Sequence, residues 1–173
     1  DLAAHYGGHL IGVPRDNLPV LDTQDGARPL YLAQSAWEPV TAYRRYHGAR
    51  RALLAFGAPA FLAGQAAAEL AAAGLPADVH IVNSLPVPDG ALAALVGRYP
   101  EGVVTVEDGL IGCAQTGLRG FAGVVAAAAG AGGVPAAHVG ITDPRVAPAD
   151  GHLETWAHFG ISAAALAAAV RSL

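Results

Sequence analysis

The chain has 173 residues, close to the ~150 typical of one compact domain, with 10 arginines, no lysine and a formal net charge of -4. This acidic balance offers no basic surface to nucleic acid or an anionic membrane, and the absence of lysine excludes a Walker loop, a Schiff base and a Ser-Lys pair. A lone Cys113 excludes a disulfide framework and a multi-thiolate metal site, and it favours a cytoplasmic location.

Four short apolar runs predict the strands of a sheet. Each is rich in apolar or β-branched residues and is bounded by Gly, Pro or Asp. They lie at 52–56, 79–82, 103–106 and 138–141. The run 103–106 lacks polar alternation, as expected of a strand that is covered on both faces.

Alanine-rich segments between these runs predict helices. Because 40 residues are alanine, the mean hydropathy of +0.38 indicates helices of small residues rather than a membrane span. Pro59 suits a first helical position and Gly74 the position just past a helix end, and Asp89 is expected to cap the next helix. The remaining helices are expected at about 117–129, 153–159 and 162–171, the last capped by Ser162.

Strands and helices that alternate at this spacing predict an α/β fold of three layers, with a mainly parallel sheet of about five strands, one edge strand antiparallel, covered by helices. The first 48 residues differ, because prolines interrupt them and no helical pattern links their two strand-like runs at 10–13 and 30–33. We interpret this stretch as the end of one domain, an extended crossing and an edge strand of the main sheet.

A glycine-rich loop follows the run 103–106 directly. Its glycines are Gly109, Gly112, Gly117, Gly120 and Gly123. Such a loop entering a helix can present backbone N–H groups to an anion, but its spacing fits neither G-x-G-x-x-G nor the Walker pattern. The alternative is that the small residues let the helix approach the sheet closely.

Carboxylates follow two of the predicted strands. Glu107 and Asp108 come after the run 103–106, and Asp143 comes after the run 138–141, at the sheet edge where ligands of parallel sheets usually bind. Each carboxylate could transfer protons or could accept N–H bonds that order its loop. The sequence leaves both roles open.

The other reactive side chains form no convincing site. His5 and His9 are separated by glycines, and no cysteine stands near a histidine pair, so a metal site is not expected. Cys113 has no nearby histidine that would activate it, and His152 and His158 flank Trp156 on a helix that we expect at the surface or an interface. The chain has one basic cluster. Clusters of this kind usually form a solvated face, but the aromatic residues beside this one suggest a protein contact. The cluster is Arg44, Arg45, Arg50 and Arg51, next to Trp37, Tyr43 and Tyr46.

The ordered set of landmarks resembles the C-terminal domain of the transketolase family, whose enzymes use thiamine diphosphate and include 1-deoxyxylulose-5-phosphate synthase and 2-oxo-acid dehydrogenase β subunits. The similar strings are ALLAFGAPAFLAGQAAAELAAAGL at 52–75, VHIVNSLPVPD at 79–89, VVTVEDGLIG at 103–112, VGITD at 139–143 and HLETWAHFGISAAALAAAV at 152–170. Upstream, GVPRDNLPVL at 12–21 resembles the last strand of the family's pyrimidine-binding domain. The chain departs from the family at CAQTGLRG and after Asp143, where relatives have shorter Gly-Gly and Phe-Gly strings.

The resemblance divides the chain into residues 1–27, the tail of a preceding domain with a linker, and residues 28–173, a complete C-terminal domain. It implies thiamine diphosphate and Mg²⁺ for the parent enzyme, which would transfer two-carbon ketol units or act on a 2-oxo acid. The metal motif and the activating glutamate belong to other domains, so no catalytic, cofactor-binding or metal residue is assigned here. We expect an inactive assembly domain whose partners are the remaining domains, a second subunit or a second copy. The alternative is an independent module that binds a small anion or metabolite at the loop 109–123.

Overall fold

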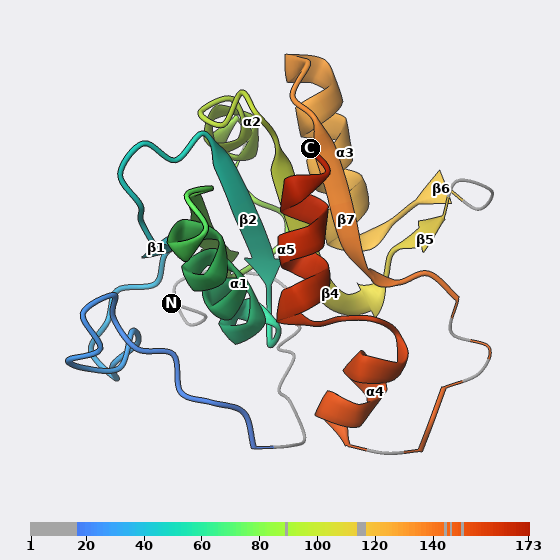
Figure 1. The fold of residues 1–173 in the computed structure, drawn as a ribbon, viewed down its shortest axis with the longest axis horizontal. Helices are drawn as coiled ribbons and strands as arrows, with labels where there is room; N and C mark the ends of the chain where they lie inside the picture. Colours follow the sequence, from blue (N-terminus) through green and yellow to red (C-terminus); the bar gives the residue numbers. More distant parts are fainter. Residues whose placement is uncertain (1–16, 89, 114–116, 144, 146, 150) are drawn as a thin grey trace, which may run out of the picture.

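The computed structural model describes residues 17–173 except 89, 114–116, 144, 146 and 150, and it has a three-layer α/β architecture (Figure 1). The strands of the main sheet are β1 (Val40–Arg44), β2 (Arg51–Phe56), β3 (Ala77–Val82), β4 (Val103–Leu110) and β7 (Ala136–Ile141). Their order across the sheet is β1-β3-β2-β4-β7. Only β1 is antiparallel to its neighbour, so the predicted sheet of five strands with one antiparallel edge is confirmed.

Helices cover both faces of this sheet. They are α1 (Ala60–Ala72), α2 (Ala91–Val96), α3 (Gly120–Gly132), α4 (His152–His158) and α5 (Ala163–Arg171). Figure 1 shows α1 and α5 side by side over one face, while α2 and α3 lie behind the sheet on the other. A small hairpin of β5 (Gly112–Cys113) and β6 (Gly117–Leu118) connects β4 to α3.

The two faces of the sheet bury different kinds of side chain. Beneath α1 and α5 the core is apolar, with Leu53, Val79 and Val104 packed on Leu70 and Leu166. The opposite face, which α2 and α3 cover, is partly apolar and also holds the buried polar residues of the described chain. These are Asp78, His80, Thr105 and Glu107. Because strand side chains alternate between faces, these four residues lie on the same side of the sheet.

The edge strand lies where the sequence analysis did not place it. The run 30–33 forms no strand, and nearby Pro29 makes only an isolated bridge to Asp22. The edge strand is β1, paired from Val40 opposite Val82, with Tyr43 directed into the core beneath α1. The partner that places β1 at this edge is β3, which lies some forty residues further along the chain. The run expected at 10–13 is outside the described residues.

The helix ends agree with the prediction at some points and differ at others. The predicted cap of α5 is confirmed, because Ser162 Oγ accepts a hydrogen bond from the Ala165 N–H at 3.1 Å. The start of α3 was predicted too early, since Gly117 pairs with Cys113 in the hairpin and the helix begins at Gly120. Asp89, the expected cap of α2, is outside the described residues.

The segment His152–Arg171 is long and apolar enough to cross a membrane by length and composition alone. It is divided at Gly160, which has a φ of 72° and separates α4 from α5. Trp156 and Leu166 are buried in the core beneath α1, and the Trp156 ring lies 6.0 Å from that of Phe61. The segment is therefore two short helices that pack on the core, α4 through Trp156 and α5 through Leu166, Ala167 and Val170.

Candidate functional site

Glu107 lies at the carboxyl end of β4, where the sequence predicted a functional carboxylate. Its side chain is only 5% exposed and points at the first turn of α3. There its Oε1 accepts the Ala122 N–H at 2.8 Å, and the Phe121 N–H also donates to the carboxylate. A carboxylate in this place satisfies amides that the helix leaves unpaired and complements the helix dipole. Glu107 thus caps the start of α3 from its position at the end of β4.

Two of the loop glycines make room for this carboxylate. A Cβ atom at Gly109 or at Gly120 would lie 2.8 Å from Glu107 Oε2, closer than such atoms approach. Gly120 also has a φ of +62°, which favours glycine. Burial raises the pKa of Glu107, and the two backbone N–H bonds partly offset that rise. The helix start that could have received a phosphate is therefore filled by the protein's own carboxylate.

The other two predicted carboxylates are more exposed. Asp108 is half-buried beside Glu107, and its charge adds to the rise in the pKa of Glu107. Asp143 is exposed and forms an ion pair with Arg145 at 2.5 Å, and its hydrogen bonds with Arg145 lower the pKa of Asp143 to about 2. Among the residues described, no group of three or more His, Cys, Asp or Glu side chains is placed to hold a metal ion.

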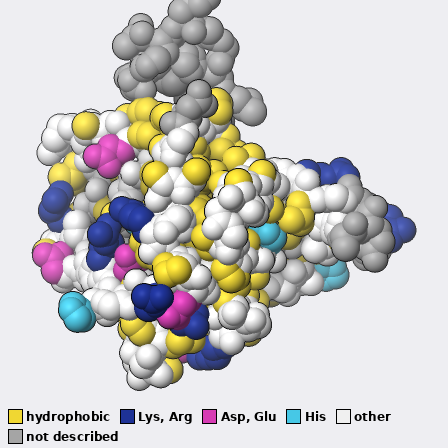
Figure 2. Space-filling model, turned by 90° about the horizontal axis from the view of Figure 1, so that it is seen from above, with side chains coloured by type: hydrophobic (Ala, Val, Ile, Leu, Met, Phe, Trp, Pro, Cys, Tyr) yellow, Lys and Arg dark blue, Asp and Glu magenta, His cyan; other side chains and the backbone are white. Residues whose placement is uncertain are grey.

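Each arginine of the basic cluster predicted at 44–51 has a partner, although two of them share one carboxylate. Arg50 and Arg51 both pair with Glu101, each at 2.5 Å, and the Arg44 guanidinium stacks on Tyr43, 3.9 Å from the ring centre. Arginine and acidic side chains lie interspersed on the face seen in Figure 2. The cluster is therefore a mixed-charge surface rather than an open basic patch.

The remaining candidates from the sequence lie apart. His152 packs edge-on against Trp156, with ring centres 5.5 Å apart, and His158 packs in the same way on Phe159. Cys113 lies half-buried on β5. Trp37 is 51% exposed, while His5 and His9 are outside the described residues.

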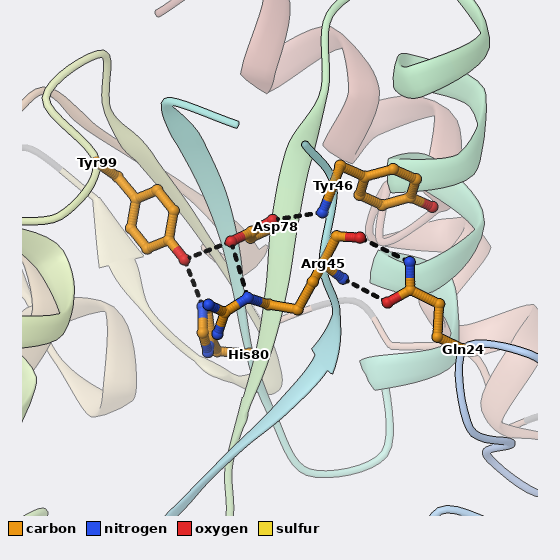
Figure 3. Close-up of polar contacts among 6 residues, drawn as sticks. All are labelled: Gln24, Arg45, Tyr46, Asp78, His80 and Tyr99. Carbon is orange, nitrogen blue, oxygen red and sulfur yellow. Dashed lines mark hydrogen bonds and ion pairs between the residues drawn. The ribbon is translucent and has the colours of Figure 1, made fainter. Parts of the chain in front are cut away.

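The structure reveals a second polar site, which the sequence analysis missed. Asp78 and His80 project from β3 toward Tyr99, which follows α2, and Arg45 reaches the same point from the end of β1 (Figure 3). Tyr99 donates its hydroxyl hydrogen to Asp78 Oδ2 at 2.8 Å, and its oxygen lies 2.6 Å from His80 Nε2. Because that hydroxyl has one hydrogen, His80 Nε2 carries the proton of the ring and donates it to Tyr99.

Asp78 also ties the end of β1 to β3. Its Oδ1 accepts the Tyr46 N–H at 2.8 Å, and its Oδ2 lies 3.5 Å from Arg45 Nε. Gln24 holds the Arg45 backbone from the other side through two hydrogen bonds of 2.6 and 2.9 Å. This network, the Asp78 network, therefore fixes the position of Arg45.

The protonation states of the Asp78 network argue against acid–base catalysis. Burial, together with the nearby Arg98 charge, lowers the pKa of His80 to about 4. Burial and the hydrogen bond to Asp78 raise the pKa of Tyr99 far above neutrality. A general acid or base works best with a pKa near the working pH, and neither group meets this condition.

A pocket of about 430 Å³ opens over this network, between β1 and α2. Its lining combines small apolar residues with Arg45, His80 and Arg98, and Glu38 also lines it. Polar residues at alternate positions of an apolar strand, as in Ala77–Val82, signal a buried network. The sequence could not show that Tyr99 and Arg45 complete it.

Comparison with known proteins identifies the fold. No family model and no curated protein matches the sequence. A solved structure of a split-gene transketolase, described as an inactive β4 tetramer, matches 91% of this chain with 23% identity and a TM-score of 0.70. Transketolases from Campylobacter jejuni and Leishmania mexicana each match 78% of the chain, with 17% and 19% identity and TM-scores of 0.56 and 0.53.

The matches cover only part of those proteins. The chain spans 47% of the split-gene transketolase chain and 18% of the other two. At these identities the likeness concerns the fold, and it agrees with the order of elements, the antiparallel edge strand and the helix layers described above. The chain therefore has a transketolase-like fold of the C-terminal-domain type.

Proposed function

We propose that this chain is the C-terminal assembly domain of a thiamine diphosphate-dependent, transketolase-like enzyme, and that it has no catalytic activity by itself. The observation that carries the proposal is the match along 91% of the chain to a split-gene transketolase, of which it spans less than half. A part of that size needs the rest of the enzyme for activity. The proposal includes a soluble, cytoplasmic protein and a domain boundary near residue 27.

The residues at the carboxyl edge of the sheet do not fit the cofactor. A diphosphate with Mg²⁺ needs oxygen ligands for the metal and free donors for the phosphates. Glu107 is committed to α3, and Asp143 to Arg145. We therefore place the cofactor in the other domains of the parent enzyme, where it supplies the carbon chemistry. The same use of Glu107 speaks against the alternative of an anion held by the loop 109–123.

An exposed aromatic surface supports an assembly role. Trp37, 51% exposed, and Tyr31, 43% exposed, line a pocket of about 360 Å³ together with Leu32 and Asn83. Tyr31 donates its hydroxyl hydrogen to Asn83 Oδ1 at 3.0 Å, which fixes this segment beside β3. Large aromatic residues exposed together are typical of protein interfaces. We infer that this surface contacts the remainder of the enzyme.

Two measurements test the proposal. Titration of the chain with thiamine diphosphate and Mg²⁺ in a calorimeter should show no micromolar binding, and saturable micromolar binding would contradict it. Mixing the chain with the polypeptide that carries the other domains should restore ketol transfer. Trp37→Ala should weaken that association at least tenfold, whereas Leu153→Ala, at an equally exposed position on α4, should leave it unchanged. Equal affinities for the two variants would remove Trp37 from the interface.

A further inference from the structure

The pocket between β1 and α2 exists because small side chains face each other there. The floor is His80 on β3, and Ala42 on β1 faces Ala91 and Ala94 on α2. The short α2 has six residues and leaves this end of the sheet incompletely covered. At about 430 Å³ the space falls within the usual range of small-molecule sites, about 300 to 1,000 Å³.

Two arginines line this space from opposite sides, and Glu38 lines it as well. Arg45 enters from the end of β1 and Arg98 from the end of α2. The Nε atom of Arg45 lies 3.5 Å from Asp78 Oδ2, and the Arg45 side chain is 58% exposed. Arg98 has no ion-pair partner among the described residues, and its guanidinium carbon lies 5.8 Å from the centre of the Tyr99 ring. Guanidinium groups placed in this way bind carboxylates and phosphates through paired N–H bonds.

The floor of the pocket is polar and fixed. His80 is 2% exposed, and its Nε2 is held by Tyr99, so the ring cannot turn. Its Nδ1 atom has no hydrogen-bond partner in the part of the chain that the structure describes and can accept one hydrogen bond. Burial is the main cause of the lowered pKa of His80; the Arg98 charge adds to it, and the charges of Asp78 and Arg45 act in opposite directions. An anion bound here would give Arg98 the ion-pair partner that it lacks among the described residues.

We propose that this pocket binds a small organic anion, whose carboxylate or phosphate is held between Arg45 and Arg98. The body of the ligand would lie against Val40, Ala94 and Leu95, and a hydroxyl or amine on it would donate to His80 Nδ1. This site is separate from the loop 109–123, and it adjoins the aromatic surface around Trp37 because Glu38 lines both pockets. It stands or falls independently of the proposed assembly role.

The test is a titration of the ¹⁵N-labelled full chain followed by NMR, with sodium phosphate in one series and sodium succinate in another. Ionic strength is held constant with sodium chloride. Amide signals of β1, α2 and His80 should shift and saturate with at least one of the two probes. Saturation by phosphate alone identifies a phosphate site, and saturation by succinate alone identifies a carboxylate site. Linear, unsaturated shifts with both probes would overturn the proposal.

Matched variants locate the binding. Arg98→Gln should weaken it at least tenfold, and Arg98→Lys should weaken it less because the charge remains. Arg28→Gln removes the same charge from an exposed position outside the pocket and should leave the affinity unchanged. Ala94→Leu, at an exposed position of α2, should abolish binding by filling the space. Equal affinity of the Arg98→Gln and Arg28→Gln proteins would show that the anion does not bind in this pocket.

Discussion

Acidification should destabilise the protein through His80. Burial, and then the Arg98 charge, lowers the pKa of His80 from 6.5 to about 4 in the folded chain. Between these two values the unfolded chain binds a proton that the folded chain does not, so stability rises with pH across this window and falls as pH drops from 6.5 to 4. The difference of 2.5 pH units, at about 1.4 kcal/mol for each, corresponds to about 3 kcal/mol. Against a typical total of about 5 to 15 kcal/mol, this loss is large.

Denaturant unfolding at pH 7.5, 6, 5 and 4 measures this effect in the wild-type chain and in His80→Gln. The variant retains a hydrogen-bond donor toward Tyr99 but cannot take up a proton. The unfolding free energy of the variant minus that of the wild type should therefore increase by about 3 kcal/mol from pH 7.5 to 4. Other groups act on both proteins alike and cancel in the difference. Burial raises the pKa of Glu107, which opposes the trend, and burial lowers the pKa of His138, which adds to it.

A replacement of exposed His47 by Gln serves as the control for loss of a histidine. The reasoning would be refuted by parallel pH profiles for the wild type and His80→Gln, with a constant difference in unfolding free energy. Such a result would mean that His80 takes up its proton in the folded chain as easily as in the unfolded one.

Four further predictions concern the helices, and chemical denaturation at pH 7.5 measures each. Glu107→Ala should lower the free energy of unfolding by about 2 to 3 kcal/mol, because it leaves two amides of α3 without a buried acceptor. The control Asp108→Ala should lower it by under about 0.5 kcal/mol. Equal losses for the two variants would contradict the capping role. Gly120→Ala should cost more than about 1 kcal/mol, since its Cβ meets Glu107 and its φ is positive. Gly130→Ala, inside the same helix with open space around it, should stabilise by about 0.5 to 1 kcal/mol, and a loss there would show that the space is not free. Ser162→Ala should cost about 1 kcal/mol through loss of the α5 cap, and an unchanged midpoint would rule that cap out as a source of stability.

The parts of the fold that the sequence predicted are those with a local signal. The strands β2, β3, β4 and β7 each contain an apolar run, and a parallel sheet needs such runs because helices cover both of its faces. Strand β1 was missed because VTAYR carries no continuous apolar run, and its pairing from Val40 to Val82 depends on a distant partner. Long-range pairing of this kind leaves no trace in a short window of sequence.

The candidate sites follow the same division. The position of Glu107 after a buried strand could be predicted from the sequence. Whether Glu107 transfers protons or caps a helix depended on where the α3 amides lie, which the sequence does not show. Asp78 and His80 were visible as polar residues in an apolar run, yet nothing near them in the sequence points to Tyr99 or Arg45. Predictions from one window of sequence therefore found positions, and the three-dimensional structure supplied the partners.

The unequal faces of the sheet have a consequence for how this protein can change over time. Beneath α1 and α5, aliphatic contacts carry no direction, so one side chain can be exchanged for another of similar volume at small cost. Beneath α2 and α3, a substitution of one hydrogen-bonded residue leaves its partners buried without a hydrogen bond. A substitution there needs a second, compensating substitution, whereas a single substitution is tolerated on the apolar side of the sheet. The two sides of the sheet therefore differ in how readily they tolerate a single substitution.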